Sequence, residues 1–188
     1  MTDRHMHPLL QKVVKDREAQ ALKDIGWGLR DRVRAVGLLT MVAWDAVTGD
    51  IKQIQHGQNL VVNLGRSGLA HLLGDADPNR KVDRMQFGDG STSPAVTDTG
   101  VSGSIILMNG GAQFKTVTRS YPDPFPGLDL KVQFEATVAQ NEGNGAGTQI
   151  YREAALFEVG GDLFSRKVTG DITKDNTLVL TATWTIIF

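Results

Sequence analysis

The feature that most constrains the fold is a regular alternation of apolar and polar side chains near residue 130. Its apolar members are Leu128, Leu130, Val132, Phe134, Ala136 and Val138. The residues between them, from Asp129 to Thr137, are all polar. Because successive side chains of a strand point to opposite faces, this segment predicts a strand with one dry and one wet face. Such a strand is typical of an antiparallel sheet that covers a core on one side.

Further strand-like segments run through the rest of the chain, with turn residues between them. They are residues 37–44, 51–62, 82–87, 112–120, 150–159, 163–168 and 177–188. Gly49 and the Gly160–Gly161 pair sit in the two short hairpin connections, where glycine supplies a positive φ. About eight strands at roughly ten-residue spacing predict a mainly β fold, an antiparallel β-sandwich or jelly-roll-like domain over residues 36–188.

One short helix is expected inside this β domain, over Leu64–Leu73. Asn63 can cap its start and Gly74 can end it. Its spacing of apolar residues predicts one buried face, made of Leu64, Leu69, Leu72 and Leu73. In the strand before it, the side chains expected to point inward are Ile51, Ile54 and Leu60.

Residues 1–35 differ from the rest of the chain in charge and in glycine content. They hold eight Lys/Arg against five Asp/Glu and two Gly, whereas residues 36–188 hold twelve against sixteen and nineteen Gly. Helical spacing places four apolar residues on one face: Leu22, Ile25, Leu29 and Val33. We expect a helical arm whose stripe packs either on its own domain or, for docking and oligomerisation, on a neighbouring subunit.

Composition excludes several kinds of chemistry. The chain has no Cys, which removes disulfides, cysteine-ligated metals and thiol nucleophiles. Its net charge of −1 gives no basic field for nucleic acid, and no apolar run is long enough to span a bilayer. We therefore expect neither a nucleic-acid partner nor a membrane span.

Candidate ligand and catalytic groups form no complete constellation. The His5–His7 pair lies near the chain start, and His71 follows Ser67 on the expected helix without a third group. The run Asp75–Asn79 begins like a calcium loop, but Arg80 and Gln86 occupy positions that need Gly and Glu. The Gly88–Thr92 loop lacks the Lys and the following helix of a phosphate site. The sequence predicts no catalytic residue, no metal and no cofactor, hence a protein that is not an enzyme.

Several ordered segments resemble a family of small tailed-bacteriophage virion proteins, described as tail-fibre, baseplate or neck-associated. The resemblance starts with Asn59–Arg66 and Leu69–Gly74 and continues with Met85–Thr92, Pro94 and Asp98–Gly100. It ends with Ile150–Phe157, in which Glu153 precedes the small–small–Leu–Phe run Ala154–Phe157, and then with Leu163–Val168 and Leu180–Ile186. Together these segments cover about residues 37–188.

The resemblance implies a non-enzymatic structural role in a virus particle, as a connector, collar or fibre-like protein near the tail, baseplate or neck. It carries over no catalytic residue. The implied partners are other virion proteins, and by analogy with fibre-like proteins the chain is expected to be a homo-oligomer, taken as a trimer. Assembly would take place in the host cytoplasm and the final location would be the virion.

Two alternatives stay open. A small β protein with an arm also suits a capsid (head) decoration protein, which the sequence does not separate from the other positions. A receptor- or carbohydrate-binding module on the virion would need exposed aromatic side chains, and the candidates are Trp44, Tyr121 and Phe125.

Overall fold

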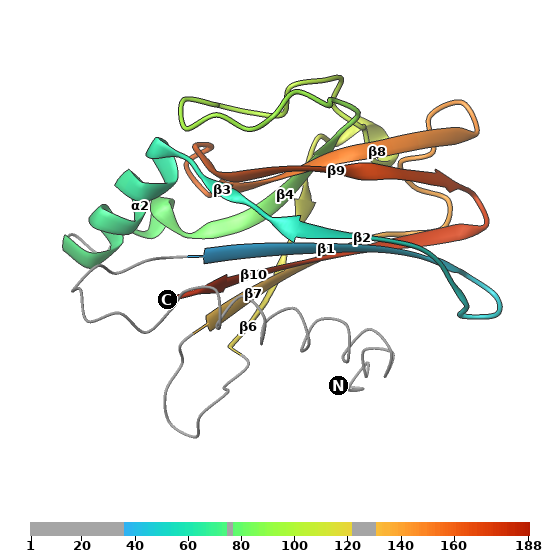
Figure 1. The fold of residues 1–188 in the computed structure, drawn as a ribbon, viewed down its shortest axis with the longest axis horizontal. Coiled ribbons are helices and arrows are strands. Elements are labelled where there is room, and N and C mark those ends of the chain that lie inside the picture. The colour runs from blue at the N-terminus through green and yellow to red at the C-terminus, as the bar shows by residue number, and fades with distance from the viewer. Residues whose placement is uncertain (1–35, 75–76, 122–130) are drawn as a thin grey trace.

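A computed structural model describes residues 36–74, 77–121 and 131–188 of the chain (Figure 1). The described part is mainly β and holds two five-stranded antiparallel sheets with one α-helix. Sheet A has the order β2-β1-β10-β7-β6, with bounds Ile51–Gln58, Val36–Asp45, Leu178–Ile187, Lys131–Val138 and Thr118–Ser120. Sheet B has the order β3-β9-β8-β4-β5, with bounds Leu60–Val61, Leu163–Asp175, Thr148–Glu158, Val82–Gly88 and Lys115–Thr116.

The alternation around residue 130 behaves as predicted within β7. Phe134, Ala136 and Val138 are buried in the main core, whereas Thr137 is exposed. Leu128 and Leu130 lie outside the described residues. The strand is paired antiparallel on both sides, with β10 and with β6, so the expectation of an antiparallel sheet is confirmed.

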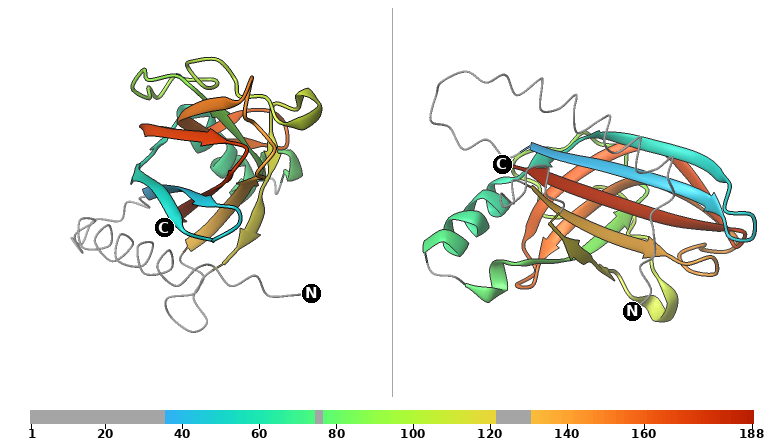
Figure 2. Two further views of the ribbon diagram at one scale, coloured as in Figure 1. Left: turned by 90° about the vertical axis from the view of Figure 1, so that its right-hand side faces the viewer. Right: turned by 90° about the horizontal axis from the view of Figure 1, so that it is seen from below.

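The main core fills the space between the two sheets, which lie one over the other (Figure 2). Sheet A contributes alternate residues of β10, among them Leu180, Ala182, Trp184 and Ile186. Sheet B contributes Met85, Phe87 and Tyr151, with the rings of Phe87 and Tyr151 packed edge to face. Interleaved side chains from two sheet faces form the kind of dry layer that makes apolar burial the main source of stability.

Both lateral edges are closed by chain that passes from one sheet to the other. On one side β2 of sheet A continues into β3 of sheet B, and on the other β5 of sheet B continues into β6 of sheet A. The prediction of a single strand over residues 112–120 is therefore wrong. The chain turns at the buried Val117, so that β5 pairs with β4 and β6 with β7.

A side chain completes the hydrogen bonding where β2 faces β9. The Gln53 amide donates to the Thr173 carbonyl over 2.7 Å and accepts from the Thr173 N–H over 2.9 Å. These two bonds satisfy backbone groups that a free edge would expose, which protects the edge from pairing with another chain.

The inward positions expected in β2 point the other way. Ile51 and Ile54 pack with Trp44 around Val42, in a small cluster separate from the main core. Val42 lies between Met41 and Ala43, which belong to the main core, so this cluster is on the opposite face of sheet A. Leu60, in β3, is half-buried.

The expected internal helix is present as α2, Asn63–Gly74, but glycines make its closest contacts. Gly65 and Gly68 are its buried residues, whereas Leu64, Leu69 and Leu72 are half-buried and Leu73 is 91% exposed. A Cβ on Gly65 would come closer than 3.0 Å to the Phe164 backbone. The helix rests on β9 through this close approach. The prediction that Leu73 belongs to the buried face is therefore wrong.

Two 3₁₀ turns complete the elements, η1 at Pro78–Arg80 and η2 at Asn109–Gly111. The predicted hairpins are confirmed: Gly49 and Gly161 both adopt positive φ, 75° and 96°. The first turn is also held by Asp45, whose carboxylate accepts from the N–H groups of Val47 and Thr48. These hydrogen bonds lower the Asp45 pKa, as expected for a carboxylate that serves the backbone.

Candidate functional site

The predicted docking stripe, Leu22, Ile25, Leu29 and Val33, lies outside the described residues together with the whole arm 1–35. Its docking role therefore stays a prediction. Phe125 and the His5–His7 pair also lie outside the described residues.

Within residues 36–74, 77–121 and 131–188, no group of three or more His, Asp or Glu side chains could hold a metal ion. In the run Asp75–Asn79, which begins like a calcium loop, residues 77–79 are described and have a structural role. Asp77 caps η1, where its carboxylate accepts from the Asn79 N–H over 2.9 Å. Capping residues of this type satisfy the free N–H groups of a helix start.

Sequence reasoning missed a buried ion pair on sheet B, between Glu153 of β8 and Arg166 of β9. Both side chains are at most 1% exposed. The Arg166 Nε donates to Glu153 Oε2 over 2.8 Å, and Nη2 lies 2.6 Å from the same oxygen. A carboxylate buried so deeply keeps its charge only when a cation and hydrogen-bond donors surround it. The alternation of the two strands gave no signal for this pair, because charged residues in a strand usually face water.

The loop between β4 and η2 supplies those donors. The N–H groups of Gly90, Ser102 and Gly103 donate to Glu153 Oε1 over 3.1, 2.9 and 2.9 Å. We call Glu153, Arg166 and Asp98, with these three N–H groups, the Glu153 anchor. It fixes a loop of irregular backbone to the sheet.

Asp98 and Thr92 complete the anchor on the arginine side. Arg166 donates to the Asp98 carboxylate over 2.6 Å and to the Thr92 carbonyl over 2.7 Å. Burial opposes ionisation of Asp98, but the hydrogen bonds from the Ala95 N–H and from Arg166 outweigh it and lower the Asp98 pKa. The anchor thus ties the loop to β8 and β9 at several points, as a structural clamp does.

A second buried cation, Lys174 of β9, holds the loop that follows β7. Its ammonium donates to the carbonyls of Gln140 and Glu142 and to the Asn144 side-chain oxygen, over 3.1, 2.8 and 2.6 Å. Burial lowers the Lys174 pKa to about 8, since desolvation penalises the charged form. The nearby Tyr151 hydroxyl donates to the Gly143 carbonyl over 2.8 Å, and burial raises its pKa.

A third buried ionic contact joins η1 to the β8–β9 hairpin. Arg80 pairs with the fully buried Glu158 over 3.3 Å and also with Asp162. Burial raises the Glu158 pKa, although Arg80 acts against this rise. This pair lies beside α2, where Gly68 leaves room for the Glu158 carboxylate.

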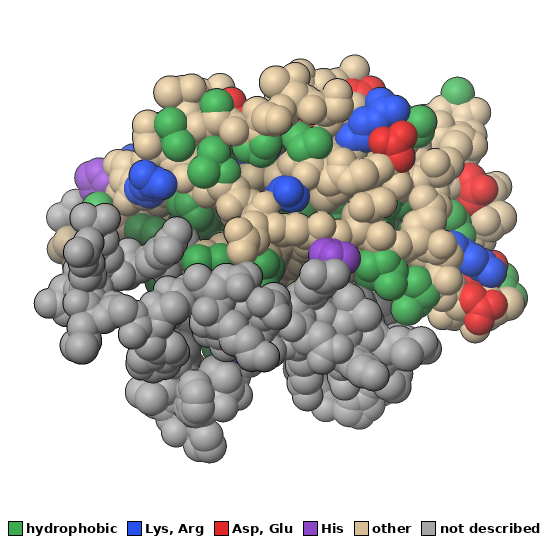
Figure 3. All heavy atoms as spheres, in the orientation of Figure 1, with side chains coloured by type: hydrophobic (Ala, Val, Ile, Leu, Met, Phe, Trp, Pro, Cys, Tyr) green, Lys and Arg blue, Asp and Glu red, His purple; other side chains and the backbone are tan. Residues whose placement is uncertain are grey.

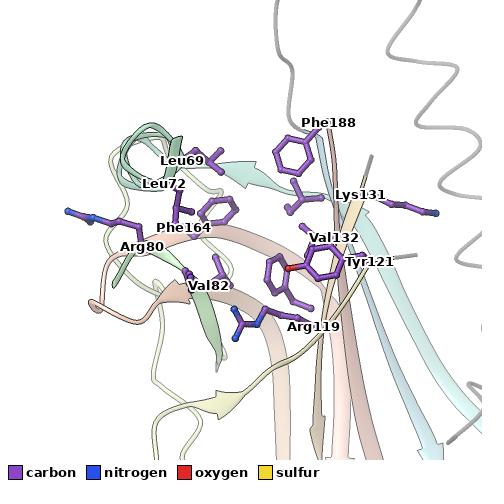
Figure 4. A pocket seen from close by; sticks show the side chains of 13 residues that line it. Leu69, Leu72, Arg80, Val82, Arg119, Tyr121, Lys131, Val132, Phe164 and Phe188 are labelled. Atoms are coloured by element: carbon purple, nitrogen blue, oxygen red, sulfur yellow. The ribbon is translucent and has the colours of Figure 1, made fainter. Parts of the chain in front are cut away.

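Next to α2, the space between the sheets opens into a cavity of about 300 Å³ (Figure 4). Its apolar wall draws on α2 and on both sheets: Leu69, Leu72, Val82, Val132, Phe134, Phe164, Ile186 and Phe188. Lining side chains from both sheets meet here with those of the helix, which places the cavity at the α2 end of the sheets. A volume of this size lies at the lower end of the range for small-molecule sites.

Four cations and one phenol border the cavity: Arg80, Lys81, Arg119, Lys131 and Tyr121. In Figure 4 the Arg80 and Lys131 side chains extend away from the cavity, whereas Arg119 extends across it and the Tyr121 hydroxyl is turned inward. None of the described lining residues is acidic. Convergent polar groups on an apolar wall are the usual mark of a binding site, so this cavity is the candidate functional site.

The aromatic candidates for sugar binding are placed differently from one another. Trp44 is half-buried at the end of β1, and its Nε1 donates to Thr181 Oγ1 over 3.3 Å. It packs in the small outer cluster around Val42 and not in the main core. Tyr121, which is 61% exposed, borders the cavity.

Charges of both signs are interspersed over the face of the molecule seen in Figure 3. The described part of the chain contains no helix that is long and apolar enough to cross a membrane. No family model, no curated protein and no solved structure matches this chain.

Proposed function

We propose that this protein is a non-enzymatic structural component of a tailed-phage virion, built on an antiparallel β-sandwich or jelly-roll-like domain. It would act as a connector, collar or fibre-like protein near the tail, baseplate or neck. The proposal is supported by the resemblance of residues 37–188 to small virion proteins and by what those residues do in the fold.

The observation that carries the proposal is the convergence of four resembling segments in the Glu153 anchor. Gly90, Asp98, Glu153 and Arg166 come from four separate segments of the sequence, and their polar groups meet around one buried carboxylate. Each segment therefore helps to hold the loop between β4 and η2 on sheet B. The charged groups at the centre of the Glu153 anchor have protein partners. A set of motifs used in this way favours architecture over catalysis.

Residues 1–35 would attach the domain to its neighbours. Their balance of +3 is opposite to the −4 of residues 36–188, and the stripe of Leu22, Ile25, Leu29 and Val33 gains by burial on a partner. We propose a homo-oligomer, taken as a trimer, because a closed symmetric assembly repeats one such contact.

The test is incorporation of the full chain into particles formed in host cells that carry the gene. We expect wild-type protein to sediment with purified particles, and Leu29→Asp combined with Val33→Asp to remain in the soluble fraction. Arg30→Asp is the matched control, since it alters charge beside the stripe and should still be incorporated. Absence of the wild-type protein from particles would overturn the virion role, and normal incorporation of the double variant would overturn the anchoring role.

Two alternative virion roles make different predictions. For a capsid decoration protein, antibody labelling would cover the head instead of the tail or neck. For a receptor- or carbohydrate-binding module, the full chain would bind specific glycans on an array, and the exposed Tyr121 is the described aromatic that favours this role. An array without specific binding would argue against it.

A further inference from the structure

We propose that the cavity beside α2 binds an apolar group that carries a carboxylate, with Arg119 as its anion-binding residue and Tyr121 as a second hydrogen-bond donor. This site is independent of the virion role. The chemistry follows from three properties of the cavity: its apolar wall, the direction of its polar side chains, and the distribution of charge around it.

The wall selects an apolar group of limited size. The volume of the cavity, about 300 Å³, is that of about ten molecules of liquid water. Phe164 and Ile186 are at most 4% exposed and form the floor, while Phe188 is 49% exposed at the mouth. A phenyl ring or a short alkyl chain fills such a space and removes the apolar surface around it from water.

The position of Arg119 selects an anion. Arg119 lies directly opposite Phe134 in the β6–β7 pair, and Phe134 belongs to the main core. Side chains of directly paired residues share a face of the sheet, so Arg119, an exposed residue of this edge strand, projects from the inner side and extends across the mouth of the cavity in Figure 4. A guanidinium binds a carboxylate through two parallel hydrogen bonds, and a carboxylate is the smallest such anion that an apolar ring or chain of this size can carry into the cavity.

Two of the other three cations of the rim are less available. Arg80 is engaged by Glu158 and Asp162, and in Figure 4 it extends away from the cavity together with Lys131. In the described part of the chain, Arg119 makes no ion pair with an acidic side chain. Of the rim cations labelled in Figure 4, Arg119 is the one that extends across the cavity, and the described lining contains no acidic side chain.

A competing explanation is that Arg119 only prevents another chain from pairing with β6, the edge strand of sheet A. Inward-pointing charges on edge strands discourage pairing with another chain, and β6 is the last strand of sheet A. That role would make Arg119 important for solubility but would give the cavity no preference for carboxylates. The two explanations are separated by ligand binding.

The experiment is an NMR titration of the full chain with 3-phenylpropanoate, 3-phenylpropanol and 3-phenylpropylamine. We expect saturable shifts at the lining residues with the carboxylate, about tenfold weaker binding of the alcohol and still weaker binding of the amine. Equal affinity for the alcohol and the carboxylate, shifts that map elsewhere, or no saturable shift would overturn the proposal.

Variants assign the site. Arg119→Gln should weaken carboxylate binding about tenfold, and Arg119→Lys should give an intermediate loss because it keeps the charge without the planar fork. Leu72→Trp should block binding by filling the cavity. Arg66→Gln removes an exposed cation of α2 that does not line the cavity, and it should leave affinity unchanged. An Arg119→Gln protein with unchanged affinity would show that Arg119 only guards the edge.

A further titration with a peptide distinguishes two sources of such a carboxylate, the end of a polypeptide and a free aryl or alkyl carboxylate. Acetyl-Gly-Gly-Phe presents an apolar ring and a terminal carboxylate on one residue, and its amidated form removes the charge. Stronger binding of the free-acid peptide than of 3-phenylpropanoate indicates the end of a polypeptide as the source. The reverse order indicates a free aryl or alkyl carboxylate.

Discussion

At the scale of single residues, the buried charges of this protein have defined protein partners. Glu153 accepts from an arginine and from three backbone N–H groups, and Lys174 donates to oxygens of the loop after β7. Buried ions of this kind contribute little net stability when complete but are costly to break. Their effect is to fix particular loops on sheet B, which two substitutions can test.

Glu153→Gln should lower the free energy of unfolding by about 3–5 kcal/mol, because it removes the more deeply buried of the two carboxylates that pair with Arg166. Urea denaturation of the full chain measures this loss. Asp171→Asn is the matched control, since it breaks the more exposed Arg152–Asp171 pair and should have a much smaller effect. Equal losses for the two variants would contradict the role given to the anchor.

Lys174 should make stability depend on pH in a defined direction. Its pKa is lowered to about 8 in the folded protein from 10.5, so between these values the unfolded chain binds more protons and stability rises with pH. Relative to Lys174→Met, the wild-type unfolding free energy should be constant below about pH 7 and then rise by up to about 3 kcal/mol towards pH 10.5. A parallel pH dependence of both proteins would show that Lys174 does not titrate as proposed.

At the scale of elements, close backbone approach decides how α2 packs. Gly65→Ala places a methyl group against the Phe164 backbone, so we expect loss of stability and faster proteolysis at the helix. Gly74→Ala is the control, because open space surrounds Gly74 and the change should be nearly neutral. Unchanged proteolysis of the Gly65→Ala protein would mean that α2 does not rest on β9 as described.

The contact between Gln53 and Thr173 should matter for the lateral edge. Gln53→Ala removes two hydrogen bonds, so we expect faster exchange of the Thr173 amide and a stability loss of about 1 kcal/mol. Gln58→Ala, at an exposed position of the same strand, should leave that exchange rate unchanged. Equal exchange in both variants would contradict the closure of this edge.

Period-2 patterns predicted β7 well because one face of this strand lies on the core and the other does not. The alternation of β7 and the glycine turns at Gly49 and Gly161 are both present in the structure. Patterns failed where contacts between residues far apart in the sequence determine the structure. The examples are the break at Val117, the outward direction of Ile51 and Ile54, and the glycine face of α2. The Glu153–Arg166 pair depends on the register of the β8–β9 hairpin and on the loop that covers it, and the cavity depends on strands far apart in the sequence, so no local spacing could reveal them.

At the scale of the whole molecule, two crossing connections close both sides of the paired sheets and leave an opening beside α2. A domain with protected edges suits repeated use in an assembly, since unwanted strand pairing is blocked. We expect sedimentation equilibrium of the full chain to give a trimer, and a monomer at all concentrations would contradict the proposed oligomer.

The most direct test of the central claim, a structural role in a virion, is electron cryomicroscopy of particles produced with the wild-type gene. Our account predicts repeated copies of this two-sheet unit at the tail, baseplate or neck, arranged with rotational symmetry. Particles that lack density for this unit, in preparations from cells that produce the protein, would contradict it.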